Sequence, residues 1–213
     1  KRFPKYVVNP SDIVRDYGAD TLRLYEMFMG PLEVSKPWSS AGVEGAKRFI
    51  VRVWNFFTEP ANLTDDNDGA LTKIYHQTVK KVTDDFEALA FNTAISQLMI
   101  FMNAAYKAGK CPKEYAEGII KMMSCITPHV CEEMWQKLGH NDTIAYEPWP
   151  VYDEKELVVD TIEIAVQING KVRGKINVGV DEDQDSAIAK AKANPDVAAA
   201  IEGKNIVKEI YVK

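Results

Sequence analysis

The chain has 213 residues, of which 46% are hydrophobic and 27% charged, a length and composition that suit two globular domains with true cores. Its formal net charge is −5, which excludes a uniformly basic nucleic-acid binder. Any contact with nucleic acid is therefore expected at local patches.

Cysteine content and hydropathy indicate a cytoplasmic protein. The three cysteines form no even disulfide framework, which favours a reducing compartment. No apolar run approaches the roughly 20 residues that a membrane span needs, and no signal peptide is present, so no membrane partner is expected. Because the chain starts with Lys1 and ends inside a strand-like run, we expect it to be a piece of a longer protein.

The N-terminal segment predicts two short helices. Asn9 and Pro10 suit the cap and first position of a helix over residues 10–17. Asp20 is expected to cap a second helix over residues 21–29, which a Gly-Pro pair ends.

Long amphipathic helices separated by short breaks follow and predict an antiparallel bundle. The expected helices cover residues 39–57, 70–88, 92–107, 112–125 and 128–138. Residues 141–156 contain Pro148, Trp149 and Pro150 and are expected to be a flexible domain junction that allows several poses.

The last third of the chain predicts a small α+β domain. We expect a hairpin over residues 160–178, helices over 184–192 and 196–202, and a third strand over 205–212, in the order ββααβ. The predicted fold class is multidomain and mainly α, a helical bundle followed by this domain. The predicted domains are residues 1–38, 39–150 and 151–213.

The pairing register of the two hairpin strands predicts which side chains share its outer face. A two-residue turn at Asn169 and Gly170 would place the apolar positions of the first strand on the face of the basic positions of the second. A three-residue loop over 168–170, with Gly170 in the left-handed conformation, restores alternation. In this register one outer face carries three basic residues, and Ile168 is exposed in the turn; the three are Lys171, Arg173 and Lys175.

These three basic residues predict contact with RNA phosphates, and Ile168 predicts contact with unpaired bases. The alternative is a solubilising face on which Glu163 pairs with Lys175. A second basic patch on the first long helix is also predicted to contact RNA, with a solvated helix face as the alternative; it consists of Lys47, Arg48 and Arg52.

Catalytic motifs are missing from the sequence. It contains no phosphate-binding GxxxxGK[ST], no GxSxG and no GxGxxG. Cys125, His129 and Cys131 do not have a usual zinc spacing, and buried helical cysteines are the simpler explanation. We therefore predict no catalytic residue, no metal site and no cofactor within this chain.

Several stretches together resemble one family, the class I aminoacyl-tRNA synthetases, and the bacterial leucyl-tRNA synthetases in particular. Residues 7–10 and 17–33 resemble the segment that follows the lysine signature loop of class I enzymes. The more leucyl-specific likeness lies in Ser35-Lys36-Pro37-Trp38, in residues 42–54, in Pro128–Trp135 and in Val166–Lys175.

The resemblance implies which functions of the whole enzyme belong to this chain and which belong to other domains. Whole enzymes of this family ligate leucine to tRNA(Leu) with ATP and Mg²⁺, using Rossmann catalytic and editing domains that are absent here. It implies that residues 1–38 contact the tRNA stem, that the bundle is an anticodon-binding-type domain and that the last domain binds tRNA. The chain alone is then expected to be inactive and monomeric. Lys1 is expected to be a remnant of the signature loop that binds ATP.

Two alternatives remain open. The chain could be a stand-alone helical protein-interaction module, or the equivalent part of a valyl- or isoleucyl-type synthetase. The second alternative fits the N-terminal segment but fits the C-terminal domain poorly.

Overall fold

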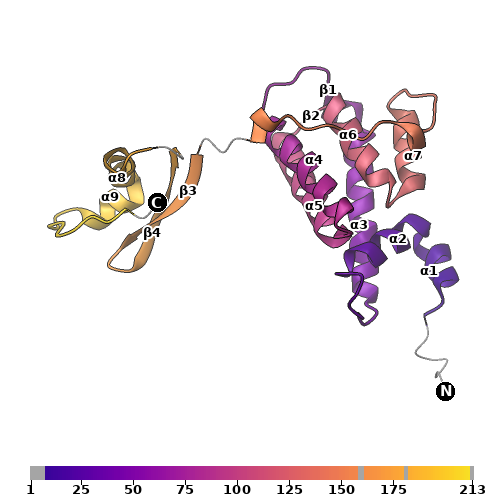
Figure 1. Ribbon diagram of the computed structural model, residues 1–213, viewed down its shortest axis with the longest axis horizontal. Helices are drawn as coiled ribbons and strands as arrows, with labels where there is room; N and C mark the ends of the chain where they lie inside the picture. The colour runs from indigo at the N-terminus through magenta and orange to yellow at the C-terminus, as the bar shows by residue number, and fades with distance from the viewer. Residues whose placement is uncertain (1–7, 158–160, 180–181, 212–213) are drawn as a thin grey trace. The chain divides into compact units, whose positions relative to one another are not determined.

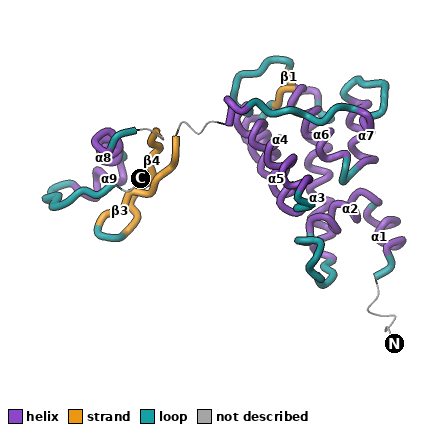
Figure 2. Tube along the Cα trace, in the orientation of Figure 1, coloured by secondary structure: helices purple, strands orange, loops and turns teal. Residues whose placement is uncertain are grey.

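The computed structural model describes residues 8–157, 161–179 and 182–211, with helices as the main element (Figures 1 and 2). The chain divides into two compact units, one ending at Leu157 and the other beginning at Val158. The predicted fold class, mainly helical with a small α+β part, is confirmed. None of the described helices is long and apolar enough to cross a membrane.

Helices α1 (Pro10–Tyr17) and α2 (Ala19–Phe28) begin the first unit. The Asn9 side chain accepts a hydrogen bond from the Ser11 amide and caps α1 as predicted. Gly18, with φ of 94°, ends α1 and precedes α2 directly. Asp20 was expected to cap α2, but it lies inside the first turn of that helix and makes its hydrogen bonds elsewhere.

Five helices form the bundle and bury a continuous apolar core. They are α3 (Ser40–Phe57), α4 (Thr72–Glu87), α5 (Phe91–Ala108), α6 (Lys113–Ser124) and α7 (Pro128–Lys137). Each helix presents apolar residues at spacings of three and four to the core, which is the pattern that predicted them. A short helical turn η2 (Pro60–Asn62) and a parallel pair of two-residue strands, β1 (Leu63–Thr64) and β2 (Cys111–Pro112), were not predicted.

The predicted junction is a strap that packs along α4. The Trp149 Nε1 atom donates to the Thr83 hydroxyl at 2.8 Å, and the Asp153 amide donates to His76 Nδ1 at 3.0 Å. Two short turns, η3 (Ile144–Tyr146) and η4 (Glu154–Leu157), belong to the strap. The expectation of a flexible junction is therefore wrong for residues up to 157, because their polar groups are bound to the bundle.

The second unit consists of β3 (Thr161–Ile168), β4 (Lys171–Gly179), α8 (Gln184–Ala193) and α9 (Pro195–Ile201). The two strands are antiparallel and their apolar face packs on the helices. The third strand expected over 205–212 is not formed in residues 205–211. Tyr211 packs on the small core, while Val207 is 97% and Ile210 71% exposed, so this segment lacks the one-sided burial that a strand here needs.

The hairpin turn is the two-residue form, and the predicted three-residue loop is wrong. Asn169 and Gly170 have φ of 50° and 77°, as a type I′ turn requires, and Ile168 pairs with Lys171. A two-residue turn alone would have placed apolar and basic side chains on the same face, and a β-bulge prevents this. The strand pairs on either side of the bulge leave Arg173 without a partner on β3. One extra residue resets the alternation of β4.

Gly174 allows the start of α9 to approach β4. A Cβ atom at Gly174 would lie 2.9 Å from Asn194 Oδ1 and 3.0 Å from a Val197 methyl group. Asn194 caps α9 through the amides of Asp196 and Val197, and its side-chain amide donates to the Lys175 carbonyl at 3.2 Å. The glycine therefore lets one asparagine join helix and strand.

We predict that Gly174→Ala destabilises the second unit by about 1–3 kcal/mol, because the new methyl group meets a capping side chain that cannot retreat without losing its hydrogen bonds. Hydrogen exchange of the whole chain, read on peptides from β3 and β4, measures this. Asn177→Ala on the exposed face of β4 is the control, and equal protection in both variants would contradict the account.

Glu182 also joins a strand to a helix in this unit. Its carboxylate accepts from Lys190 Nζ at 2.8 Å, the Ser186 hydroxyl at 2.5 Å and the Gly179 amide at 2.6 Å. These hydrogen bonds, that from Lys190 first, lower the pKa of Glu182 to about 2. These contacts favour the charged carboxylate, which links the end of β4 to α8.

The lowered pKa predicts acid sensitivity of the second unit. The folded pKa lies below the ordinary value of 4.5, so Glu182 stabilises the fold above about pH 4.5 and this stability is lost as the pH falls toward 2. The amide resonances of β4, followed by NMR through this range, report the loss. Glu182→Gln should flatten the dependence, whereas Glu202→Gln at an exposed position should leave it intact; an unchanged profile in Glu182→Gln would refute this role.

Candidate functional site

The basic residues of the hairpin are exposed, but they do not share one face as predicted. Lys171 lies opposite Ile168, whereas Lys175 lies opposite Ala165 on the other side of the sheet. Arg173 stands at the bulge between them. Because the bulge changes the parity of β4, the cations surround the hairpin tip instead of lining one surface.

Lys175 has a partner within the hairpin. Its Nζ atom lies 2.5 Å from Glu163 Oε1, and both side chains are more than half exposed. The hydrogen bond to Glu163 raises the pKa of Lys175. Such an exposed pair contributes little stability, but Glu163 offsets one of the three positive charges of the hairpin.

Ile168 is the last residue of β3 and is only half-buried. The prediction placed it in the turn as an exposed apolar contact. Because the turn contains only Asn169 and Gly170, Ile168 remains in the ladder opposite Lys171. The premise for stacking against bases is therefore wrong.

The predicted second patch is engaged in contacts within the first unit. Lys47 Nζ donates to the Tyr17 carbonyl at 3.2 Å, which joins α3 to the end of α1. Arg48 lies 3.8 Å from Glu44, one turn away on α3. Arg52 donates from Nη1 to Asn103 Oδ1 of α5 at 2.7 Å, and its guanidinium carbon lies 4.5 Å from the centre of the Tyr106 ring. Each of the three cations thus has a partner within the first unit.

Lys1, the expected ATP contact, lies outside the described residues. Among the residues that the structure describes, no cluster of three or more His, Cys, Asp or Glu side chains could hold a metal ion. Cys111 and Cys131 are buried, and burial raises the pKa of each thiol to about 12. The expectation of buried helical cysteines holds for Cys131 but is wrong for Cys125, which is exposed.

The carboxylate of Asp20 is buried, at 8% exposed, and accepts hydrogen bonds from another helix. It accepts hydrogen bonds from the Val130 amide at 2.7 Å and the His129 amide at 3.4 Å. The His129 ring nitrogen Nδ1 lies 2.7 Å from Asp20 Oδ1. Asp20 therefore caps α7 from another helix, and its charge faces the positive end of that helix.

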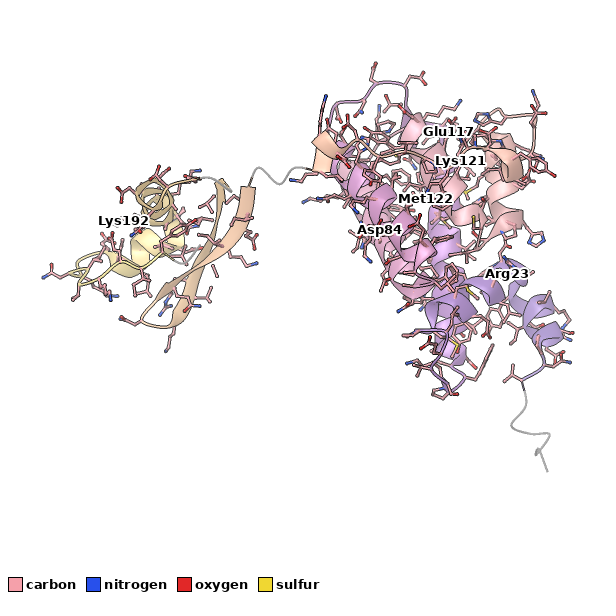
Figure 3. The ribbon with its side chains drawn as sticks, viewed as in Figure 1. Arg23, Asp84, Glu117, Lys121, Met122 and Lys192 are labelled. Atoms are coloured by element: carbon pink, nitrogen blue, oxygen red, sulfur yellow. The ribbon has the colours of Figure 1, made fainter. Side chains whose placement is uncertain are left out.

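Arg23 makes the complementary contact one turn further along α2 (Figure 3). Its Nε atom donates to the Ile126 carbonyl at 2.7 Å, and its Nη2 atom donates to the Cys125 carbonyl at 3.0 Å. These carbonyls follow the end of α6, where a helix leaves acceptors without partners. Asp20 and Arg23 together bind both sides of the turn between α6 and α7.

Sequence reasoning missed this clamp because it assigned Asp20 to its own helix. Thr127 occupies the N-cap position of α7, but its hydroxyl donates to the Met123 carbonyl and makes no capping bond to α7. An aspartate followed three residues later by an arginine is a weak sequence signal for a contact between distant helices. It does not name a partner more than 100 residues away.

Comparison with known proteins agrees with this architecture. A family model described as the anticodon-binding domain of tRNA ligase matches residues 68–189, more than half of the chain. The chain is also similar to the agnB2 LeuRS of Agrobacterium radiobacter K84, solved as a ternary complex with tRNA and LeuAMS, with 25% identity and a TM-score of 0.73. The match covers 100% of this chain and 30% of that one, so the chain spans less than a third of that relative.

We predict that Asp20→Ala destabilises the first unit by roughly 2–3 kcal/mol, since it leaves amides at the start of α7 without an acceptor. Asp20→Asn keeps an oxygen and should cost about 1 kcal/mol. All four tryptophans precede residue 150, so tryptophan fluorescence in a urea titration reports this unit alone.

Asp16→Ala is the matched control, because Asp16 is half exposed and pairs only with Arg15. It should change stability by less than about 0.5 kcal/mol. If Asp20→Ala unfolded at the same urea concentration as Asp16→Ala, the clamp would have no energetic weight.

Proposed function

Because the chain belongs to the family of anticodon-binding domains of tRNA ligases, we propose that it is the tRNA-binding part of a leucine–tRNA ligase. In this role it positions tRNA(Leu), while Rossmann catalytic and editing domains of the same enzyme carry out ATP- and Mg²⁺-dependent attachment of leucine and its proofreading. The observation that carries the proposal is the family match together with the likeness of the whole chain to a LeuRS.

Leucine is favoured by two observations. The solved relative is a LeuRS, and its likeness extends over 100% of this chain, including the hairpin unit. The segment Val166–Lys175 is also the stretch that most resembles leucyl enzymes. The protein is proposed to act as a monomer in the cytoplasm during protein synthesis.

The two alternatives differ in what now supports them. A stand-alone protein-interaction module was suggested by the apolar helices, and those helices are now accounted for by the anticodon-binding domain family. A valyl- or isoleucyl-type enzyme would share the bundle, so the choice of tRNA distinguishes it from the leucyl assignment.

We assign phosphate contact to Lys171 and Arg173 at the hairpin tip. Both side chains are exposed, and none of the ion pairs among the described residues involves either of them. Unpaired cations at a protruding turn can approach an RNA backbone without breaking an existing pair. This supports the tip, more than the Lys175 side, as the contact of the second unit.

Lys171→Ala and Arg173→Ala should each weaken tRNA(Leu) binding by about 0.5–2 kcal/mol and make its salt dependence shallower, because each removes one phosphate contact. Lys175→Ala should cost less, since Glu163 already offsets its charge. Fluorescence anisotropy with labelled tRNA(Leu) transcript at several salt concentrations measures both quantities.

Lys204→Ala is the control, because Lys204 is an exposed lysine of the same unit that binds only the Ala200 carbonyl. Transcripts of tRNA(Val) and tRNA(Ile) test specificity. Absence of tRNA binding by the wild-type chain would sink the proposed function, and tighter binding of tRNA(Val) or tRNA(Ile) would transfer it to the alternative enzyme.

A further inference from the structure

The two edges of the hairpin sheet differ in how their backbone groups are used. At the outer edge of β4, the Lys175 carbonyl accepts from the Asn194 side chain at 3.2 Å, and the Gly179 amide donates to the Glu182 carboxylate at 2.6 Å. Residues 162–168 of β3 make no backbone hydrogen bond beyond β4 within the part of the chain that the structure describes. One edge of the sheet is therefore closed, and the other is open.

The strand register shows which groups of β3 are left open. In an antiparallel pair, residues directly opposite each other either bond to each other or both point away from the pair. Lys175 points away, because its carbonyl binds Asn194, and it lies opposite Ala165. Ala165 therefore directs its N–H and C=O outward, and so do Glu163 and Gln167, which lie two residues away on the same strand.

The strand β3 has none of the features that usually block a sheet edge. It is eight residues long, with one charged side chain and no proline, and the bulge of the hairpin lies in β4. Short length, charge, proline and bulges are the usual means of preventing strand addition. The open edge of β3 can therefore accept a further strand.

A groove runs along this open edge. It has a volume of about 540 Å³ and touches four successive residues of β3, 164–167. Successive side chains of a strand point to opposite faces, so a groove that touches all four follows the backbone edge. Its other walls are α8 and the segment 208–211. Its volume falls within the usual range of ligand sites.

The lining of the groove is mostly apolar. Its floor consists of three apolar residues of α8, which are Ala187, Ile188 and Ala191. Ile164 and Val166 of β3 line it and are only half-buried. Among the described residues of the lining, Lys208 alone is charged; it is exposed, and none of the ion pairs found in this unit involves it. A ligand that fits this lining is apolar and carries a negative charge.

We propose that this groove binds an extended peptide of a partner protein, which adds a strand to the edge of β3. The three outward-pointing residues of β3 supply the backbone hydrogen bonds, as in other cases of strand addition. Alternate apolar side chains of the peptide lie on the floor formed by α8, and a peptide carboxylate lies beside Lys208. Recognition of a protein partner goes beyond the proposed role in positioning tRNA.

Other occupants fit the groove less well. The protein's own segment 205–211 is held at the opposite wall, since Glu209 pairs with Lys192 of α8 at 2.5 Å and Tyr211 packs on the small core (Figure 3). That wall stands beside the β3 edge, so a second copy cannot bring its own β3 against it, whereas a single extended chain can enter. A compact apolar molecule would leave the outward N–H and C=O groups without partners.

Fluorescence anisotropy tests the proposal with a short labelled peptide in which valine alternates with threonine and glutamate stands at one end. We expect saturable binding to the 213-residue chain in the absence of RNA. The same peptide with N-methylated amides cannot donate to a sheet edge and should bind about tenfold more weakly or worse, because it loses several hydrogen bonds. Absence of saturable binding, or equal binding of the methylated peptide, would overturn the proposal.

Two matched proline variants locate the binding edge. Ala165→Pro removes an outward N–H from the edge of β3, whereas Asn177→Pro removes one from the outer edge of β4, because Asn177 lies opposite Glu163. Proline is tolerated where the N–H faces away from the ladder. We expect Ala165→Pro to weaken peptide binding about tenfold and Asn177→Pro to stay within about twofold of the wild type. Equal affinities of the two variants would contradict the assignment of the edge.

The charge of the groove is tested separately. Lys208→Ala should weaken binding of the glutamate peptide about 2- to 5-fold, as expected for an exposed ion pair, and should not affect a glutamine peptide. The control is Lys204→Ala, since Lys204 is an exposed lysine of the same unit outside the groove lining. An equal effect on both peptides would remove the carboxylate from the proposal.

The remaining measurements separate this proposal from its competitors. If sedimentation showed dimers of the chain that the peptide dissociates, the groove would belong to a second copy and the proposal would be wrong. If circular dichroism showed that Ala165→Pro is unfolded, the methylated peptide with the wild-type chain would decide. Binding of tRNA(Leu) should be the same for Ala165→Pro and the wild type, so failure of either proposal leaves the other standing.

Discussion

The first unit depends on two side chains of opposite charge that lie one helical turn apart on α2. Asp20 binds the amides at the start of α7, and Arg23 binds the carbonyls after the end of α6. Each charge matches the partial charge of the helix end that it meets, and each satisfies backbone groups that a buried helix end would leave without partners. The remaining helices can then pack at a fixed angle, because the turn between α6 and α7 is held from outside by α2.

This clamp also changes how the cations of the chain should be understood. A basic residue in a helical pattern can be structural or available to a ligand, and spacing does not distinguish the two. Arg23 and Lys47 donate to backbone carbonyls of other segments, and Lys175 pairs with Glu163. Lys171 and Arg173 at the hairpin tip, by contrast, take part in none of the ion pairs among the described residues.

The hairpin shows how local and global preferences were reconciled. Asn-Gly favours a type I′ turn through its own backbone conformation, while burial requires Gly174, Ile176 and Val178 to face the helices. Both demands are met because one unpaired residue at Arg173 shifts the register between them. The bulge also spreads the basic side chains around the tip, which suits a contact with a curved, charged backbone more than a flat row would.

The sequence alone determined the parts that depend on local chemistry. Periodic apolar positions predicted the helices to within a few residues, Asn9 and Pro10 predicted the start of α1, and the order of elements predicted a bundle followed by a small α+β unit. Tertiary structure decided what depends on distant partners: the capping of α7 by Asp20, the use of Lys47, the bulge at Arg173, the strap on α4 and the lack of a strand in residues 205–211. The physical reason is that helix periodicity and caps are set by neighbours in the chain, whereas a polar side chain chooses among all donors and acceptors that the fold brings near it.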